Sequence, residues 1–342
     1  MLNLLNNPNF DNERNILNAD LFVNNLKNNL KAFGFNPKVK YNVYRHVTIY
    51  NISWNDDKTY NDIIEFKKEI ALSLGINANE LKIKKLSDNE IEIKVSNMKV
   101  EPLSLKELLS LYKEDNTFKV MLGLDESDNP VYFDFDKEKS LLVTGVTGIG
   151  KTNLFNNIIM NILIYHKDVK VVILDSQSIN YNGYSEVYEV VNNEQDIIDR
   201  IRSLRKEFEE KIKSGNKDKV VVFIDEIYEI LKLDNSIKND INYLLELGSI
   251  SGMHLVVSTD SILEEDTYNL FNRDNIAKIA FYLTSRGEYN MFIGKVVRGS
   301  LNNDGMYLDS NNNLTRIIVP LVEDNEVERV VSYVKEEIKE KK

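Results

Sequence analysis

The feature that most constrains the fold of this chain is a glycine-rich turn at residues 145–152. The run Gly145-Val146-Thr147-Gly148-Ile149-Gly150-Lys151-Thr152 fits the pattern G-x-x-x-x-G-K-[ST]. It follows the apolar run Leu141–Val143 and precedes a segment with helical spacing of apolar residues. Glycines at such a turn let successive backbone N–H groups point at phosphate oxygens, at the positive end of the following helix. The sequence therefore predicts a phosphate-binding loop in an α/β domain; the alternative is a glycine-rich turn with a chance Lys-Thr.

The residue types in this loop predict what each would do with a bound nucleotide. Lys151 would reach the β- and γ-phosphates, and the Thr152 hydroxyl would be a ligand of Mg²⁺. We therefore expect ATP and Mg²⁺ to bind here. The other residues expected to contact the nucleotide are Gly145, Val146, Thr147, Gly148, Ile149, Gly150 and Asn153.

Two further apolar runs end in acidic residues. Val220–Ile224 is followed by Asp225 and Glu226, and His254–Ser258 is followed by Thr259 and Asp260. Ligands of α/β proteins bind at the carboxyl ends of such strands. We expect Asp225 to hold Mg²⁺, largely through water, and Glu226 to act as general base on the attacking water, which favours hydrolysis over nucleotide storage. Glu226 as a merely exposed acid is the alternative. Two interpretations of Asp260 remain open: it is a sensor of the γ-phosphate, or it is a solvated residue that caps the next helix.

Composition excludes several classes of protein. The chain has 342 residues and no cysteine, which excludes a disulfide scaffold, a thiolate zinc site and a cysteine nucleophile. Three histidines argue against a histidine-rich metal site. No apolar run approaches the ~20 residues that span a bilayer, so we expect a soluble, cytoplasmic chain. The net charge of -11 argues against nucleic acid, because phosphate binding is driven by basic residues.

The pattern of apolar residues changes along the chain and predicts two domains. Residues 1–20 are rich in Asn and are expected to form a flexible lead. Residues 21–103 predict a small α+β domain, with helices over 21–33 and 62–74 and strands within 38–52, 82–85 and 90–95. In residues 104–342, short β-branched runs alternate with helical runs, which predicts a mainly parallel sheet.

Two weaker signals have structural interpretations. Arg202, Arg205 and Lys206 lie among glutamates on a predicted helix over 194–214, which favours a salt-bridged outer face over phosphate tracking. His254 lies within an apolar run and is expected to be a core histidine.

These motifs resemble the FtsK/SpoIIIE family of hexameric DNA translocases, within the wider FtsK–HerA ATPases. The specific matches are Thr144–Thr152, Asp225-Glu226, Gly252–Leu255 and Ile279–Phe281, and residues 121–131 are similar to the strand pair that precedes the family's phosphate loop. Residues 33–97 resemble its α domain more loosely. The resemblance implies an α/β fold: a RecA-like P-loop NTPase domain with a mainly parallel sheet, preceded by the small α+β domain.

The sequence departs from the family at three places. Gln177 stands where the family often has Lys, Ser249 stands where it has an arginine, and Thr259–Ile262 replaces Thr-Gln-Arg-Pro. An arginine commonly stabilises charge on the γ-phosphate, so hydrolysis is expected either to be slow or to use another cation. The candidates, each of which could instead be a solvated surface residue, are in order Arg286, Arg298 and Arg273.

The resemblance implies an ATP-dependent motor that forms a ring, expected to be a hexamer, and moves double-stranded DNA. Membrane insertion is not expected, although a membrane or mobile-element partner is compatible with the family. A packaging or secretion ATPase of the same superfamily and a nucleotide-gated DNA-binding scaffold with weak hydrolysis are the alternatives. In a ring only the lumen has to be basic, so the acidic charge predicts weak, salt-sensitive DNA binding by the monomer.

Overall fold

The computed structural model describes residues 1–8, 13–78, 81–97, 100, 102–178, 180–273, 275–295 and 304–340. Contacts divide the chain into two units. The larger unit comprises Met1–Pro8, Leu103–Asp125 and Pro130–Lys342, and the smaller unit comprises Asn9–Pro102 and Glu126–Asn129. Within the described residues, no helix is long and apolar enough to cross a membrane.

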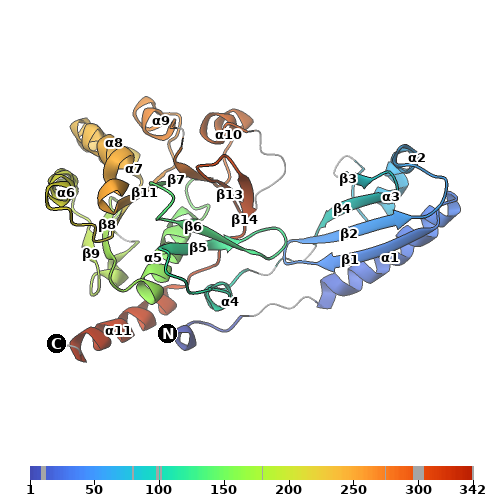
Figure 1. Ribbon diagram of the computed structural model, residues 1–342, viewed down its shortest axis with the longest axis horizontal. Coiled ribbons are helices and arrows are strands. Elements are labelled where there is room, and N and C mark those ends of the chain that lie inside the picture. Colours follow the sequence, from blue (N-terminus) through green and yellow to red (C-terminus); the bar gives the residue numbers. More distant parts are fainter. Residues whose placement is uncertain are drawn as a thin grey trace. The chain divides into compact units, whose positions relative to one another are not determined.

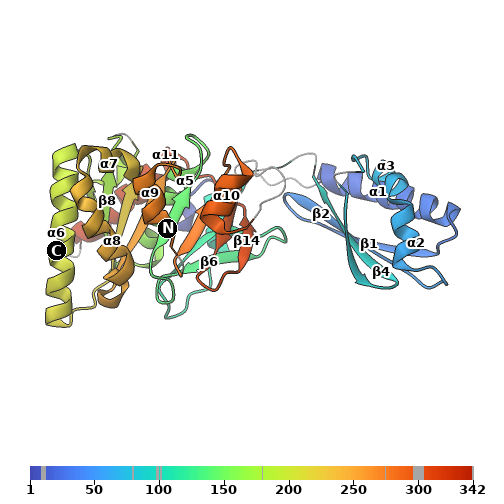
Figure 2. The same ribbon diagram turned by 90° about the horizontal axis from the view of Figure 1, so that it is seen from above.

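The smaller unit is an antiparallel sheet with helices on one face (Figure 2). Its strands, in the order β1-β2-β4-β3, are β1 (Pro37–Val43), β2 (Val47–Trp54), β3 (Lys82–Ser87) and β4 (Glu90–Ser96). Its helices are α1 (Glu13–Ala32), α2 (Tyr60–Glu65) and α3 (Lys67–Ser73). Alternate strand residues such as Ile52 and Ile93 are fully buried against these helices, as the period of two requires.

Two expectations for residues 1–74 are wrong. The expected flexible lead over 1–20 contains a short 3₁₀ helix, η1 (Leu2–Leu4), and the first eight residues of α1, whose buried stripe starts at Asn15 and Ala19. The single helix expected over 62–74 is two helices, since Phe66 leaves the helical conformation at φ −94°, ψ 19°.

The larger unit contains an eight-stranded sheet in the order β14-β13-β12-β7-β11-β10-β8-β9 (Figure 1). The parallel strands are β7 (Leu141–Thr144), β8 (Lys170–Asp175), β9 (Glu189–Val191), β10 (Val220–Asp225), β11 (Met253–Thr259) and β12 (Ala277–Ala280). The antiparallel pair β13 (Gly305–Leu308) and β14 (Leu314–Ile317) extends the sheet beyond β12. A separate ribbon is formed by β5 (Lys119–Leu124) and β6 (Pro130–Asp134).

Helices bury both faces of this sheet. One face packs against α5 (Lys151–Tyr165) and α11 (Asp324–Glu340), and α4 (Leu105–Ser110) packs on β5 of the ribbon. The other packs against α6 (Glu194–Ser214), α7 (Ile227–Leu233), α8 (Lys238–Leu247), α9 (Glu265–Phe271) and α10 (Arg286–Ile293). The short 3₁₀ helices are η2 (Asn182–Tyr184), η3 (Asn235–Ile237) and η4 (Gly248–Ser251). A mainly parallel sheet between two helical layers confirms the predicted α/β class.

The strand order decides which side chains meet. β11 lies between β7 and β10, and all three run parallel. The carboxyl ends of these strands therefore bring the end of β7, the end of β10 and the end of β11 to one edge of the sheet. The glycine-rich turn, Asp225-Glu226 and Asp260 are therefore neighbours at this edge, although about 80 residues separate the first two in the chain and about 35 separate the last two.

Candidate nucleotide-binding site

The glycine-rich turn joins β7 directly to α5, as predicted. Gly145, Gly148 and Gly150 all have positive φ, at 158°, 78° and 115°. A Cβ on Gly145 would lie 2.8 Å from both Ile149 Cγ2 and Phe281 Cβ, so no larger residue fits there. A Cβ on Gly148 would meet no atom within 4 Å, so there the conformation alone favours glycine.

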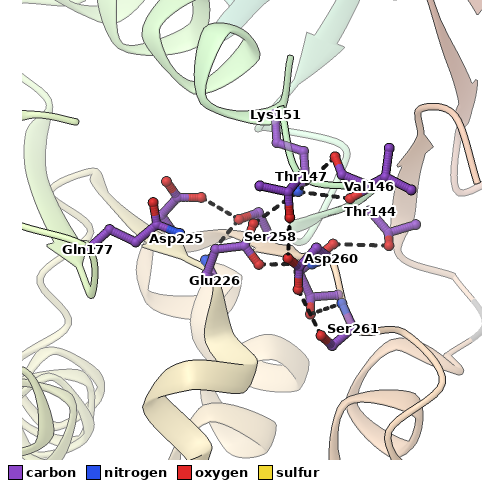
Figure 3. Close-up of polar contacts among 12 residues, drawn as sticks. Thr144, Val146, Thr147, Lys151, Gln177, Asp225, Glu226, Ser258, Asp260 and Ser261 are labelled. Atoms are coloured by element: carbon purple, nitrogen blue, oxygen red, sulfur yellow. Dashed lines mark hydrogen bonds and ion pairs between the residues drawn. The ribbon is translucent and has the colours of Figure 1, made fainter. Parts of the chain in front are cut away.

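Lys151 begins α5, and its ammonium group is buried within the site. Nζ donates to the Gly145 carbonyl at 2.8 Å and lies 2.9 Å from Glu226 Oε1 (Figure 3). The side chains of Lys151 and Glu226 are only 4% and 8% exposed. The loop and the acidic strand end, predicted separately, are therefore joined by a buried ion pair.

Asp225 and Glu226 form a compact region of buried negative charge at the end of β10. Burial raises the pKa of both carboxyl groups, and the positive charge of Lys151 opposes this shift in each. Glu226 has the left-handed conformation φ 53°, ψ 62°, which turns the chain sharply from β10 into α7. Strain of this kind in a non-glycine residue is concentrated at functional sites.

Ser258, near the end of β11, fixes both acids. Its hydroxyl donates to Asp225 Oδ1 at 2.5 Å and accepts the Glu226 backbone N–H at 3.0 Å. The second Glu226 oxygen accepts the backbone N–H of Asp260 at 2.8 Å. The middle strand therefore sets the orientation of the residues that follow its neighbour β10.

Asp260 contacts the glycine-rich loop through its side chain. Oδ2 accepts a hydrogen bond from the Thr147 hydroxyl at 2.6 Å, and Oδ1 accepts one from Ser261 at 2.7 Å (Figure 3). Burial acts to raise the pKa of Asp260, but these hydrogen bonds and the charge of Lys151 outweigh it, so the pKa lies below its ordinary value. Asp260 is placed beside the loop as a charged group.

The oxygen atoms of Thr152 and Asp225 suit a magnesium ion. Both are hard ligands, and the Tyr181 hydroxyl donates a hydrogen bond to Asp225 Oδ2. No group of three His, Asp or Glu side chains able to hold a metal occurs in the described part of the chain. Mg²⁺ that binds with a nucleotide is usually held by one or two carboxylates together with water and phosphate oxygens.

Two loop residues expected to contact nucleotide have other partners. The Asn153 amide donates to Pro320 O at 2.6 Å and accepts the Val322 N–H at 2.9 Å, so its side chain anchors the segment before α11. Only its backbone N–H, in the first turn of α5, is left for a phosphate. The Val146 N–H donates to Tyr282 O at 3.1 Å.

The candidate arginines differ in their surroundings. Arg286 is the first residue of α10, is exposed, and makes no hydrogen bond or ion pair to the described residues. Arg273 is held by Leu270 O, Glu246 and Asn242, so it is a structural residue. Arg298 lies outside the described residues. Ser249 lies in η4, before the amino end of β11, and so at the opposite edge of the sheet from Asp225.

The weaker signals have the structural roles expected of them. Arg202 pairs with Asp234 at 2.6 Å and Arg205 with Glu209 at 3.0 Å, and Arg205 also lies over the Tyr243 ring of α8. His254 is buried, and its Nδ1 lies 2.9 Å from the Lys139 carbonyl. Because a carbonyl can only accept, Nδ1 carries the proton.

Comparison with known proteins identifies the family. A model of the FtsK/SpoIIIE family matches residues 110–298, which is more than half of the chain. The chain belongs to the FtsK/SpoIIIE family. DNA translocase FtsK of Staphylococcus aureus (strain Mu50) is 26% identical over 351 aligned residues, covering 91% of this chain and 44% of that protein. DNA translocase FtsK of Listeria monocytogenes is 24% identical, covering 90% and 46%. The chain thus spans less than half the length of these relatives.

Solved structures show the same fold. The pCW3 conjugation coupling protein TcpA, solved as a monomer with ATPγS, superposes with a TM-score of 0.58 at 15% identity, covering 95% of this chain and 99% of that one. The cytoplasmic domain of the Thermomonospora curvata type VII secretion ATPase EccC gives 0.55 at 17% identity, covering 68% and 34%. The FtsK/SpoIIIE resemblance and the P-loop ATPase fold expected from the sequence are both confirmed.

Proposed function

We propose that this protein is an ATP-dependent double-stranded DNA translocase that works as an oligomeric ring, expected to be a hexamer. The observation that carries the proposal is the buried Lys151–Glu226 ion pair, which joins a complete phosphate loop to two acids at the edge of the sheet. The family membership and the DNA translocases among the relatives support DNA as the substrate that is moved.

Nucleotide binding would begin with exchange of partners at Lys151. Its ammonium group is held by Glu226 and by the Gly145 carbonyl, at the position where a γ-phosphate is expected. A phosphate carries more charge than the single carboxylate, so it would draw Nζ away from Glu226. The backbone N–H groups at the start of α5 would bind the remaining oxygens.

Hydrolysis would then use the released Glu226. Its Oε1 is free once Lys151 turns to the phosphate, while Oε2 stays on the Asp260 N–H and keeps the carboxylate oriented. Glu226 would accept a proton from the attacking water. Mg²⁺ held by Thr152 and Asp225 would withdraw charge from the phosphate oxygens.

Arg286 is the residue that we propose to act on a neighbouring subunit. It is exposed at the start of α10 and free of partners among the described residues, so it could reach across an interface without breaking a bond. Arg273, which makes three hydrogen bonds, could not. An arginine acting in trans is worth about 10³–10⁵ in rate.

DNA binding is proposed to need the assembled ring. With a net charge of -11, a single chain should bind duplex weakly and lose binding in salt. Six identical surfaces around one duplex would raise the effective affinity by multivalency. We propose a cytoplasmic location and, for recruitment, a partner protein at a membrane or on a mobile element.

The test is ATP hydrolysis by the purified chain with and without duplex DNA. Duplex should stimulate hydrolysis, and Lys151→Ala and Glu226→Ala should abolish the stimulated rate. Glu229→Ala is the matched control, since Glu229 lies on α7 only three residues away and is half-exposed. Intact nucleotide binding without stimulation by any duplex would overturn the translocase proposal.

A second function is favoured by Ser249 and Asp260, which stand where the family has other residues. A chain without an effective arginine would be a nucleotide-gated DNA-binding scaffold with weak hydrolysis. Single-turnover hydrolysis at saturating DNA separates the two, because a motor hydrolyses its bound ATP rapidly and a scaffold does not. A protein-secretion ATPase would hydrolyse ATP without stimulation by free duplex, whereas a packaging ATPase, which also moves DNA, would be stimulated.

A further inference from the structure

A buried tyrosine hydroxyl is hydrogen-bonded to Asp225, one of the two proposed magnesium ligands. Tyr181 is fully buried, and its OH donates to Asp225 Oδ2 at 2.9 Å. It comes from the turn between β8 and η2, which matches none of the motifs identified in the sequence. The hydrogen bond therefore ties the turn after β8 to the end of β10.

The hydrogen bonds to Asp225 leave acceptor sites free for a metal. A phenol has one proton, and Tyr181 donates it to Asp225. Asp225 has Tyr181 on one oxygen and Ser258 on the other, and each oxygen retains a further acceptor site.

The surroundings make this arrangement rigid. The Asp175 carboxylate accepts the backbone N–H groups of Gln177 and Asn180, at 3.2 and 3.0 Å, and so fixes the turn that carries Tyr181. The Tyr181 ring packs near Phe155 of α5, with ring centroids 6.4 Å apart. Asp225 is 2% exposed, so bulk water cannot replace a lost donor.

We propose that Tyr181 is a positioning residue that holds Asp225 in the geometry needed to bind Mg²⁺ with ATP. This inference rests on the proposed nucleotide-binding function. Partners of metal ligands typically change metal affinity by about 10- to 100-fold when they are removed.

Tyr181→Phe tests the proposal, with Tyr184→Phe as the matched control. Tyr181→Phe removes only the hydroxyl and keeps the volume of the ring. Tyr184 lies three residues away, is equally buried, and its hydroxyl has no hydrogen-bond partner. The measurement is the affinity for a fluorescent ATP analogue in EDTA and over a range of Mg²⁺ concentrations, with circular dichroism to compare the folds.

We expect Tyr181→Phe to change the Mg²⁺ dependence of nucleotide binding and to leave metal-free binding unchanged. In EDTA, all three proteins should bind the analogue within about twofold of one another. The Mg²⁺ concentration that gives half of the metal-dependent increase should rise about 10- to 100-fold for Tyr181→Phe and stay unchanged for Tyr184→Phe. Equal Mg²⁺ dependence in wild type and Tyr181→Phe, or an equal defect in both variants, would overturn the inference. Wild-type binding that is indifferent to Mg²⁺ would instead count against the proposed metal site itself.

Discussion

Truncation of Glu226 should destabilise the nucleotide-free protein, because it leaves Lys151 buried without its closest counter-ion. Two unit charges 2.9 Å apart attract by about 6 kcal/mol at an effective dielectric constant of about 20. Part of this offsets the cost of burying both charges, and breaking a buried pair typically costs about 3–5 kcal/mol. Asp225 and Asp260 also attract Lys151. We therefore expect Glu226→Ala to lower the free energy of unfolding by about 3 kcal/mol.

A double-mutant cycle isolates the interaction free energy of the Lys151–Glu226 pair. Lys151→Met removes the buried charge, so Lys151→Met/Glu226→Ala should be more stable than Glu226→Ala alone, with a coupling energy of about 2 kcal/mol. Glu229→Ala breaks the exposed pair with Lys232 and should cost less than about 1 kcal/mol.

The assay is urea unfolding without nucleotide, followed by far-ultraviolet circular dichroism. Trp54 is the single tryptophan and lies in the core of the smaller unit. Its fluorescence therefore reports on the unit that lacks the site, and that transition should not shift in any variant. A Glu226→Ala protein within about 0.5 kcal/mol of wild type, or a cycle without coupling, would refute the buried ion pair.

Two further predictions concern the loop and the core. Gly145→Ala should abolish binding of a fluorescent nucleotide, because the added Cβ would collide with Phe281. Gly148→Ala should only weaken binding, through backbone strain alone. Equal loss of binding in the two variants would contradict the packing argument. Burial lowers the pKa of His254 below 6.5, so the unfolded chain takes up this proton first and the free energy of unfolding should fall as the pH drops through about 6.5. Urea unfolding at pH 7.5 and 5.5 should show a smaller difference for His254→Gln, and an unchanged difference would contradict this assignment.

Local patterns were sufficient to predict the phosphate loop and the acids that follow β10. Gly145–Thr152 and Asp225-Glu226 can be recognised because each motif is contiguous and directly follows an apolar run. The helix over 194–214 was predictable for the same reason, since its apolar stripe is regular and Gly215 ends it in the left-handed conformation. The start of α1 was missed because Asn15 occupies a core position in place of an apolar residue.

Contacts made between distant segments could not be read from the sequence. Ser258 and Tyr181 meet Asp225 only because β11 lies beside β10 and the turn after β8 folds over their ends. Ser258 stands at the end of an apolar run, which is a weak signal for a residue at the sheet edge. Tyr181 lies in an irregular segment, where no period indicates which way a side chain points. The hydrogen bond from Asn153 to the Pro320 carbonyl likewise joins residues that lie 167 positions apart in the chain.

The most direct test of the translocase proposal is displacement of a triplex-forming strand from duplex DNA by the purified chain. With Mg²⁺ and ATP, the wild-type protein should displace the third strand, and Lys151→Ala and Glu226→Ala should not. Displacement should also stop when ATP is replaced by a non-hydrolysable analogue. ATP hydrolysis by a folded, ring-forming protein that leaves the triplex intact would contradict the account.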